Sequence, residues 1–172
     1  LSLRLAPSLN VLVSPSQSAF ISGRSIHNNF MLVQQTERYL HRSKASRVLL
    51  KLGIARAFDA VSWPFLLEVM RHLGFGTRWC EWISILLATA STRVLLNGVP
   101  GPHIHHANGL RQGDPMSPML FTLVIDVLNS LMLHATMTRL LRRLSPSLAA
   151  PSVSLYADDV AIFYHPGMGQ LL

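Results

Sequence analysis

The stretch SLYADDVAIF, residues 154–163, places two adjacent acids inside an otherwise apolar run. Its flanking side chains prefer burial, and a buried carboxylate costs several kcal/mol unless a cation or hydrogen bonds compensate. If the run 153–164 is a strand, a turn and a second strand, Asp158 and Asp159 lie at the tip of a hairpin. Two interpretations stay open on these residues alone: a solvated turn, where Asp is common, and a carboxylate site for a divalent metal ion.

A two-metal phosphoryl-transfer site needs a further carboxylate from another strand, because its two ions, about 4 Å apart, share a bridging ligand. The stretch VLLKLGIARAFDAVSW, residues 48–63, has the spacing of a strand, a turn and the start of a helix. We expect a fully buried strand over 48–54. Gly53 stands at its end, where a functional side chain would be most useful, and Asp59 lies six residues further on, beyond the turn.

Apolar periodicity and turn residues divide the rest of the chain into alternating helices and strands. The expected helices cover 1–13, 26–41 (with Ile26, Phe30, Val33 and Tyr39 or Leu40 on its apolar face), 63–73 (with Ser62 as N-cap and Gly74 past its end), 77–90 and 115–137. A loop is expected over 14–25, a hairpin over 92–107 around Asn97-Gly98, and a basic connection over 140–151. One α+β unit is the simplest interpretation.

Composition narrows the class of protein. The 172 residues are 49% hydrophobic and 13% charged, which excludes a disordered chain. Fifteen Lys and Arg against eight Asp and Glu give a net charge of +7, which favours a polyanionic partner, most commonly nucleic acid. A basic globular protein without such a partner is the alternative. The one cysteine, Cys80, excludes a disulfide framework and is expected to be a buried thiol.

Three other signals are weaker. Residues 116–136 approach the roughly 20 apolar residues of a membrane span, but Asp126 and Asn129 lie among them, so a core helix is favoured. The first ten residues show no signal peptide and begin without Met, which suggests a fragment of a longer protein. The histidines of the 92–107 hairpin are expected on a solvent-exposed face and not in a metal site.

Four motifs stand in a recognisable order along the chain: QSAFISGR (17–24), KLGIARAFDAVSW (51–63), GLRQGDPMSPMLF (109–121) and YADD (156–159). Together they resemble the reverse transcriptases of plant non-LTR (LINE-type) retrotransposons, from about residue 5 to residue 166. The resemblance implies the fingers–palm portion of a right-hand polymerase as one domain over 1–172, fingers-like over 1–47 and palm-like over 48–166, with the thumb absent.

The resemblance also implies an active site. Asp158 and Asp159 would be catalytic and metal-binding, with the main-chain carbonyl of Ile54 as a further ligand, and an intact family member would hold two Mg²⁺ (or Mn²⁺) ions. Nucleotide and template contacts would come from Phe58, Gln112, Gly113, Arg111 and Arg24. The residue types alone permit plainer roles: Phe58 as a core residue, the arginines as solvated surface groups, and Asp114 and Ser117 as helix-starting residues.

One position departs from the family pattern, because the family places a metal-binding Asp where this chain has Gly53. The implied reaction is RNA-directed DNA synthesis from an RNA template, a DNA primer and deoxynucleotides. Losing one bridging carboxylate should reduce its rate roughly a thousandfold or more. We therefore expect a catalytically impaired polymerase. The alternatives are a non-catalytic nucleic-acid-binding remnant and an inert relic. The expected location is intracellular, in nucleus or cytoplasm, with no membrane and no visible targeting signal.

Overall fold

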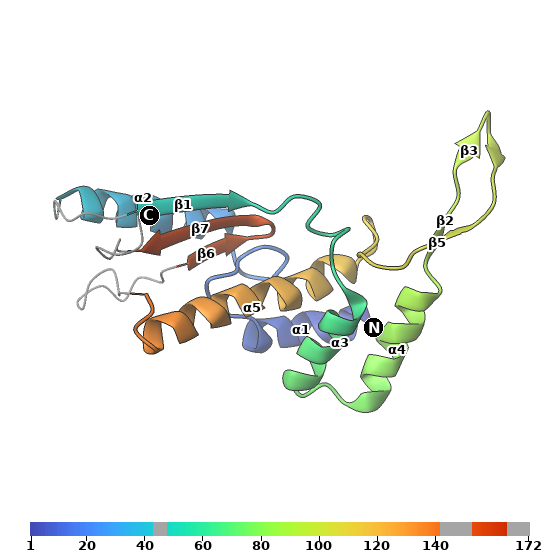
Figure 1. Cartoon of the computed structure of the whole chain (residues 1–172), viewed down its shortest axis with the longest axis horizontal. Coiled ribbons are helices and arrows are strands. Elements are labelled where there is room, and N and C mark those ends of the chain that lie inside the picture. The colour runs from blue at the N-terminus through green and yellow to red at the C-terminus, as the bar shows by residue number, and fades with distance from the viewer. Residues whose placement is uncertain (43–47, 142–152, 165–172) are drawn as a thin grey trace.

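A three-stranded antiparallel sheet forms the centre of the molecule, in a computed structural model that describes residues 1–42, 48–141 and 153–164. Its strand order is β1 (Val48–Gly53), β7 (Asp159–Tyr164) and β6 (Val153–Tyr156). The two predicted acidic-site strands therefore do come together, as Figure 1 shows. The hairpin expected over 153–164 is confirmed.

The expected burial of β1 is wrong, although the strand itself forms. Among the described strands it lies at the edge of the sheet, beside β7, and the side chains of Leu49, Leu50 and Leu52 are 45%, 40% and 38% exposed. A short apolar run fits a buried strand and an edge strand equally well by periodicity, so the sequence pattern did not distinguish them.

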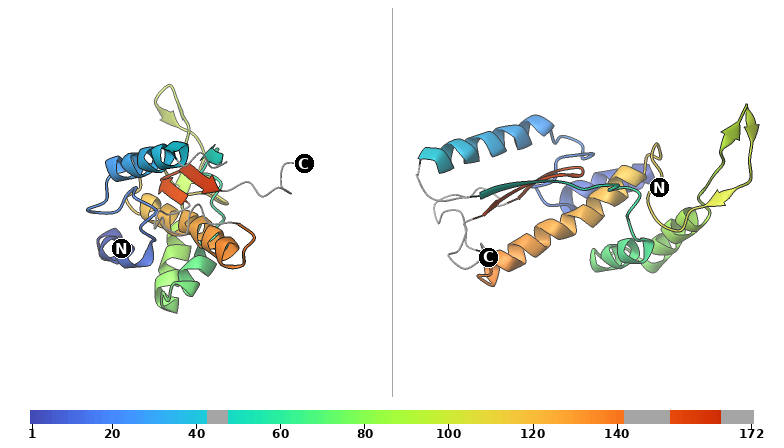
Figure 2. Two further views of the ribbon diagram at one scale, coloured as in Figure 1. Left: turned by 90° about the vertical axis from the view of Figure 1, so that its left-hand side faces the viewer. Right: turned by 45° about the horizontal axis from the view of Figure 1, so that its top comes forward.

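Five helices lie in the described part of the chain: α1 (Ser2–Leu12), α2 (Ile26–Arg42), α3 (Trp63–His72), α4 (Thr77–Ala88) and α5 (Ser117–Met137). Figure 2 shows the sheet between α2 on one side and α5 on the other. Helices α1 and α3 pack on α5, and α4 packs on α3. The core lies where α5, α1 and the inner face of the β6–β7 hairpin meet.

Helix α5 is a core helix over its first half. Leu120, Phe121 and Leu123 are buried, and the polar Asp126 is satisfied because its carboxylate accepts hydrogen bonds from the backbone N–H and the hydroxyl of Ser14. By length and composition alone, α5 is also the one helix among the described residues apolar enough to cross a membrane. Its second half is more exposed: Leu131, for example, is 60% exposed.

The buried face of α2 differs in part from the expected one. Ile26 and Phe30 are exposed, whereas Thr36 is buried and Asn29 half-buried. The side chain of Asn29 donates hydrogen bonds to the carbonyl of Leu155 and the hydroxyl of Ser154 in β6.

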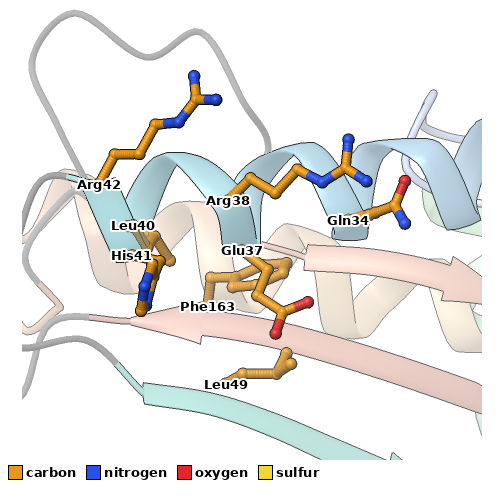
Figure 3. A pocket seen from close by; sticks show the side chains of 8 residues that line it. All are labelled: Gln34, Glu37, Arg38, Leu40, His41, Arg42, Leu49 and Phe163. Atoms are coloured by element: carbon orange, nitrogen blue, oxygen red, sulfur yellow. The ribbon is translucent and has the colours of Figure 1, made fainter.

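Of the expected apolar face, Val33 and Leu40 are half-buried, and Leu40 lines a hollow between α2 and the sheet together with Phe163 (Figure 3). The expected face is therefore correct at Val33 and Leu40 and wrong at Ile26 and Phe30.

Residues 91–105 form the expected hairpin, which projects from the body of the molecule (Figure 1). It is built in two steps, β2 (Ser91–Thr92) with β5 (Ile104–His105) and β3 (Leu95–Leu96) with β4 (Val99–Pro100). Asn97 and Gly98 both have positive φ, 49° and 81°, as a two-residue hairpin turn requires. His103 and His105 are exposed, as expected, whereas His106 is half-buried.

Local signals at the helix ends and at the cysteine are confirmed. The Ser62 hydroxyl accepts from the backbone N–H of Phe65 at the start of α3, and Gly74 follows the helix with φ 85°. Cys80 is buried. The expected basic connection over 140–151 lies mostly outside the described residues.

Candidate active site

The ends of β1 and of the β6–β7 hairpin meet at one point. Gly53 is the register partner of Asp159, which in turn pairs with Tyr156 on its other side. One residue further along, the backbone N–H of Ile54 donates to the carbonyl of Asp158 at 3.2 Å. The structure thus brings together the two acids, Ile54 and Gly53.

Gly53 has room for a side chain. Directly opposed residues of an antiparallel pair project from the same face, with Cβ atoms about 4.5–5.5 Å apart. A side chain at position 53 would therefore stand beside that of Asp159. A Cβ added to Gly53 meets nothing within 4 Å, and the residue is not in a left-handed conformation. The backbone and the space at this position therefore tolerate an Asp.

The turn between β6 and β7 consists of Ala157 and Asp158. Ala157 is buried and left-handed, with φ 53°, a conformation that costs a non-glycine residue roughly 1–2 kcal/mol. Asp158 and Asp159 are exposed. The acids therefore face solvent while the preceding alanine is fixed in the protein interior.

Three oxygen-bearing groups lie at this point. They are the carboxylates of Asp158 and Asp159 and the main-chain carbonyl of Ile54. Across the described ranges, no group of three or more His, Cys, Asp or Glu side chains is placed to hold a metal ion. Two ions that share a bridge need a further carboxylate, and β1 ends here in Gly53, which has no side chain.

Phe58 is positioned by aromatic contacts. Its ring stacks on that of Phe121 with centroids 4.5 Å apart and meets Phe20 edge-on at 6.3 Å. These contacts bear out its role as a partly buried packing residue. Its predicted contact with the sugar of a nucleotide stays a prediction.

Residues 109–110 are hydrogen-bonded to residues 58–63. The backbone N–H groups of Gly109 and Leu110 donate to the carbonyls of Val61 and Phe58, both at 2.8 Å, and the Trp63 indole N–H donates to the Gly109 carbonyl at 2.7 Å. A Cβ on Gly109 would lie 2.8 Å from the carbonyl oxygen of Asp59. A glycine at this position is therefore a condition of the close approach.

Directly after these two hydrogen-bonded residues, Arg111, Gln112 and Gly113 are exposed. The first two border a hollow of about 460 Å³, which is lined by Asp59, Thr92, His106, Asn108, Gly109, Leu110, Arg111 and Gln112. Gly113 has φ 88°, so the turn itself gives a reason for glycine there, in addition to the predicted approach of nucleic acid. The nucleotide and template contacts of these residues stay predictions.

Asp114 has a structural role at the start of α5. Its carboxylate accepts from the backbone N–H of Met116 at 2.7 Å, and its carbonyl accepts from that of Ser117. The helix-starting role expected for Asp114 is confirmed.

Arg24 lies among backbone carbonyl groups at the end of α1. Its guanidinium donates to the carbonyl oxygens of Asn10, Val13, Ser14 and Gln17. Carbonyl groups at a helix C-terminus carry partial negative charge, which favours a cation there. This arrangement engages Arg24 in bracing the chain, and its predicted phosphate contact gains no support from it.

Sequence reasoning did not single out Gln17 or Asn29, both of which contact the acidic hairpin. Gln17 is fully buried, and its side-chain oxygen accepts from the backbone N–H groups of Ala19 at 2.8 Å and Ala157 at 3.2 Å. A polar residue inside the motif QSAF was the available signal, but its partner is 140 residues away in sequence.

Comparisons with known proteins agree with these observations. The family model described as reverse transcriptase (RNA-dependent DNA polymerase) matches residues 1–167. The chain is 30% identical over 162 residues to the transposon TX1 uncharacterized 149 kDa protein of Xenopus laevis, covering 94% of this chain and 12% of that protein. It is 27% identical over 175 residues to the Pol polyprotein of the type-2 retrotransposable element R2DM of Drosophila melanogaster, covering 98% of this chain and 15% of the polyprotein.

A shorter similarity, 38% identity over 80 residues, links 46% of the chain to 13% of a Pol polyprotein from a type-1 retrotransposable element R2 of Popillia japonica. The chain thus spans less than one sixth of the length of each of these three relatives.

Proposed function

Because the chain belongs to the reverse transcriptase (RNA-dependent DNA polymerase) family, we propose that it is the palm-containing part of a non-LTR retrotransposon polymerase, impaired by Gly53. The family has the right-hand polymerase fold, generally uses divalent metal ions and acts on nucleic-acid templates and primers with nucleotides. One observation carries the proposal of impairment. Gly53 pairs in register with Asp159, beside an intact pair of acids, and brings no side chain to the site.

The expected loss follows from charge. Divalent ions in such sites stabilise the attacking and leaving oxygens of the transferred phosphoryl group. The chain retains Asp158 and Asp159 to attract these ions, but without a side chain at position 53 the neighbouring strand β1 brings no carboxylate to them. We expect polymerase activity lower than that of an intact site by roughly a thousandfold or more.

The finer assignments are part of the same proposal. Residues 1–47 are fingers-like and 48–166 palm-like within one domain, the template is RNA and the primer DNA, and the element is of the plant LINE type. Phe58, Arg111, Gln112 and Gly113 line the path of the nucleotide and template. The positions of these residues support the assignment, because the exposed loop 111–113 directly follows residues 109–110, which are hydrogen-bonded to residues 58–63.

Primer extension on an RNA template, with Mg²⁺ and with Mn²⁺, tests this function. Three proteins are compared: the chain as it stands, Gly53→Asp, and Gly53→Asn as a control of nearly equal size without the charge. We expect extension from Gly53→Asp alone. Equal extension by the unaltered chain would contradict the impairment, and restoration by Gly53→Asn would contradict the role of the carboxylate.

A second candidate function is non-catalytic binding of nucleic acid, favoured by the net charge of +7. It predicts that the logarithm of the affinity for RNA or DNA falls linearly with the logarithm of the salt concentration, because Lys and Arg side chains displace counterions from the phosphates. If none of the three proteins extends the primer and the binding is salt-sensitive in this way, this function is favoured. An affinity that does not change with salt would exclude it.

A further inference from the structure

We propose that Gln17 is a positioning residue that fixes the aspartate turn, Ala157–Asp158, and thereby determines where the carboxylate of Asp158 stands. Gln17 lies in the segment that follows α1, far from the acids in sequence. Its role at the turn does not depend on catalysis. The consequence for a metal ion rests on the function proposed above.

The first step is the contact itself. The side-chain oxygen of Gln17 accepts the backbone N–H of Ala157 at 3.2 Å and that of Ala19 at 2.8 Å, and Gln17 is 0% exposed. Ala157 is buried as well, so its N–H has no access to solvent as a substitute partner. A single oxygen thus ties the entry of the turn to the N-terminal segment.

The second step is the rigidity of Gln17. Its neighbours pair with β6, since the backbone N–H of Ser18 donates to the carbonyl of Leu155 at 3.1 Å and the N–H of Leu155 donates to the carbonyl of Ser16 at 2.8 Å. The carbonyl of Gln17 itself accepts from the guanidinium of Arg24. The main chain at residue 17 is therefore held on both sides, and its side chain reaches the turn from a fixed base.

The third step connects the turn to the acids. Ala157 is left-handed, a conformation that a non-glycine residue keeps only when its surroundings hold it. The next residue, Asp158, is held through its carbonyl by the N–H of Ile54. Gln17 thus holds the peptide group that enters the turn, and Ile54 holds the one that leaves it. Release of the Gln17 contact frees the Tyr156–Ala157 peptide group, so that the left-handed conformation of Ala157, which directs the chain into Asp158, is no longer held. Misplacement of a catalytic group by about 1 Å can cost a hundredfold in rate.

Asn29 provides a matched comparison. Its side chain also holds the hairpin, through the carbonyl of Leu155 at 2.7 Å and the hydroxyl of Ser154 at 3.0 Å, and it accepts from the hydroxyl of Ser18. All of these contacts are made to residues that precede the turn in the chain. Loss of Asn29 should loosen β6 as a whole, whereas loss of the Gln17 oxygen should loosen the turn itself.

The test compares Gln17→Asn and Gln17→Met with Asn29→Leu. In Gln17→Asn the shorter side chain still reaches the N–H of Ala19, two residues on, but no longer that of Ala157. Gln17→Met keeps the length and removes the acceptor, so that a folding failure of either variant leaves the other to decide. The first readout is amide hydrogen exchange at Ala157, followed by NMR relative to the amides of β7.

We expect either Gln17 variant to speed exchange at Ala157 at least about tenfold relative to the β7 amides, and Asn29→Leu to change both alike. The second readout is the affinity for Mn²⁺ in a Gly53→Asp background, measured by electron paramagnetic resonance. Either Gln17 variant should weaken it at least about tenfold, and Asn29→Leu should leave it within about twofold.

Equal effects of the Gln17 and Asn29 variants on both readouts would overturn the inference. Faster exchange at Ala157 with unchanged Mn²⁺ affinity would overturn the positioning of Asp158. If Gly53→Asp itself binds no Mn²⁺, the proposed metal site fails, and exchange at Ala157 alone then decides whether Gln17 fixes the turn.

Discussion

The two sides of the acidic site differ in how the rest of the molecule holds them. The turn before Asp159 is buried at Ala157 and is held by Gln17, whereas Gly53 ends an exposed edge strand with open space around it. Gly53 and Asp159 are nevertheless paired in register. Strand β1 therefore keeps its place through backbone hydrogen bonds and paired apolar residues, independently of the side chain at its end.

The largest expected effect sharpens this difference. In a Gly53→Asp background, Asp158→Asn should return primer extension to the level of the unaltered chain, a loss of roughly a thousandfold or more, because the amide attracts a divalent ion far less than the carboxylate. Extension rates on an RNA template measure it. Activity that survives Asp158→Asn would place the metal ligands elsewhere.

Opposed residues of the two strands offer a second test. Leu50 and Ile162 are register partners, but Leu50 is 40% exposed and Ile162 only 6%. Ile162→Ala should lower the free energy of unfolding by about 2–5 kcal/mol, since it leaves a cavity in the core. Leu50→Ala should cost about 1 kcal/mol or less. Denaturant titration compares them, and equal losses would contradict the description of β1 as an exposed edge.

A pair of glycines gives a third comparison. Gly109→Ala places a Cβ 2.8 Å from the Asp59 carbonyl oxygen at a φ of 80°, so we expect a loss of stability of about 1–3 kcal/mol. Gly53→Ala meets nothing and should stabilise by up to about 1 kcal/mol, because alanine loses less backbone entropy on folding. Thermal unfolding distinguishes them. A destabilised Gly53→Ala would mean that position 53 requires glycine for its backbone.

The smallest expected effect concerns the projecting hairpin. Leu96 is 76% exposed near its tip, so Leu96→Ala should change the free energy of unfolding by about 0.5 kcal/mol or less. Phe163→Ala, at a buried position of β7, should cost about 3–5 kcal/mol and is the matched contrast. A large loss from Leu96→Ala would show that the hairpin packs on the body of the protein.

Local sequence signals predicted much of this architecture. The Asn97-Gly98 turn, the cap at Ser62 and the apolar run around Asp158 depend on nearby residues, and each gave the correct element. Motif order also predicted that the end of β1 meets the acids. The first three features follow from chemistry within a short stretch of sequence, whereas the meeting of β1 with the acids is long-range and came from the resemblance.

Other features depend on residues distant in sequence. The exposure of β1 depends on which strand neighbours exist, and the buried face of α2 depends on Asn29 bonding to Ser154, 125 positions away. The contact of Gln17 with Ala157 joins a loop to a turn across the whole chain. Periodicity carries no information on such polar contacts, because they replace apolar residues at positions that hydrophobicity would assign otherwise.

Binding of Mn²⁺, which needs neither primer nor template, tests whether a carboxylate at position 53 completes a metal site with Asp158. Electron paramagnetic resonance titrations would compare the unaltered chain, Gly53→Asp and Gly53→Asp with Asp158→Asn. We predict that Gly53→Asp binds Mn²⁺ at least about tenfold more tightly than the unaltered chain, and that adding Asp158→Asn abolishes the gain. Equal affinity of the unaltered chain and Gly53→Asp would contradict the account.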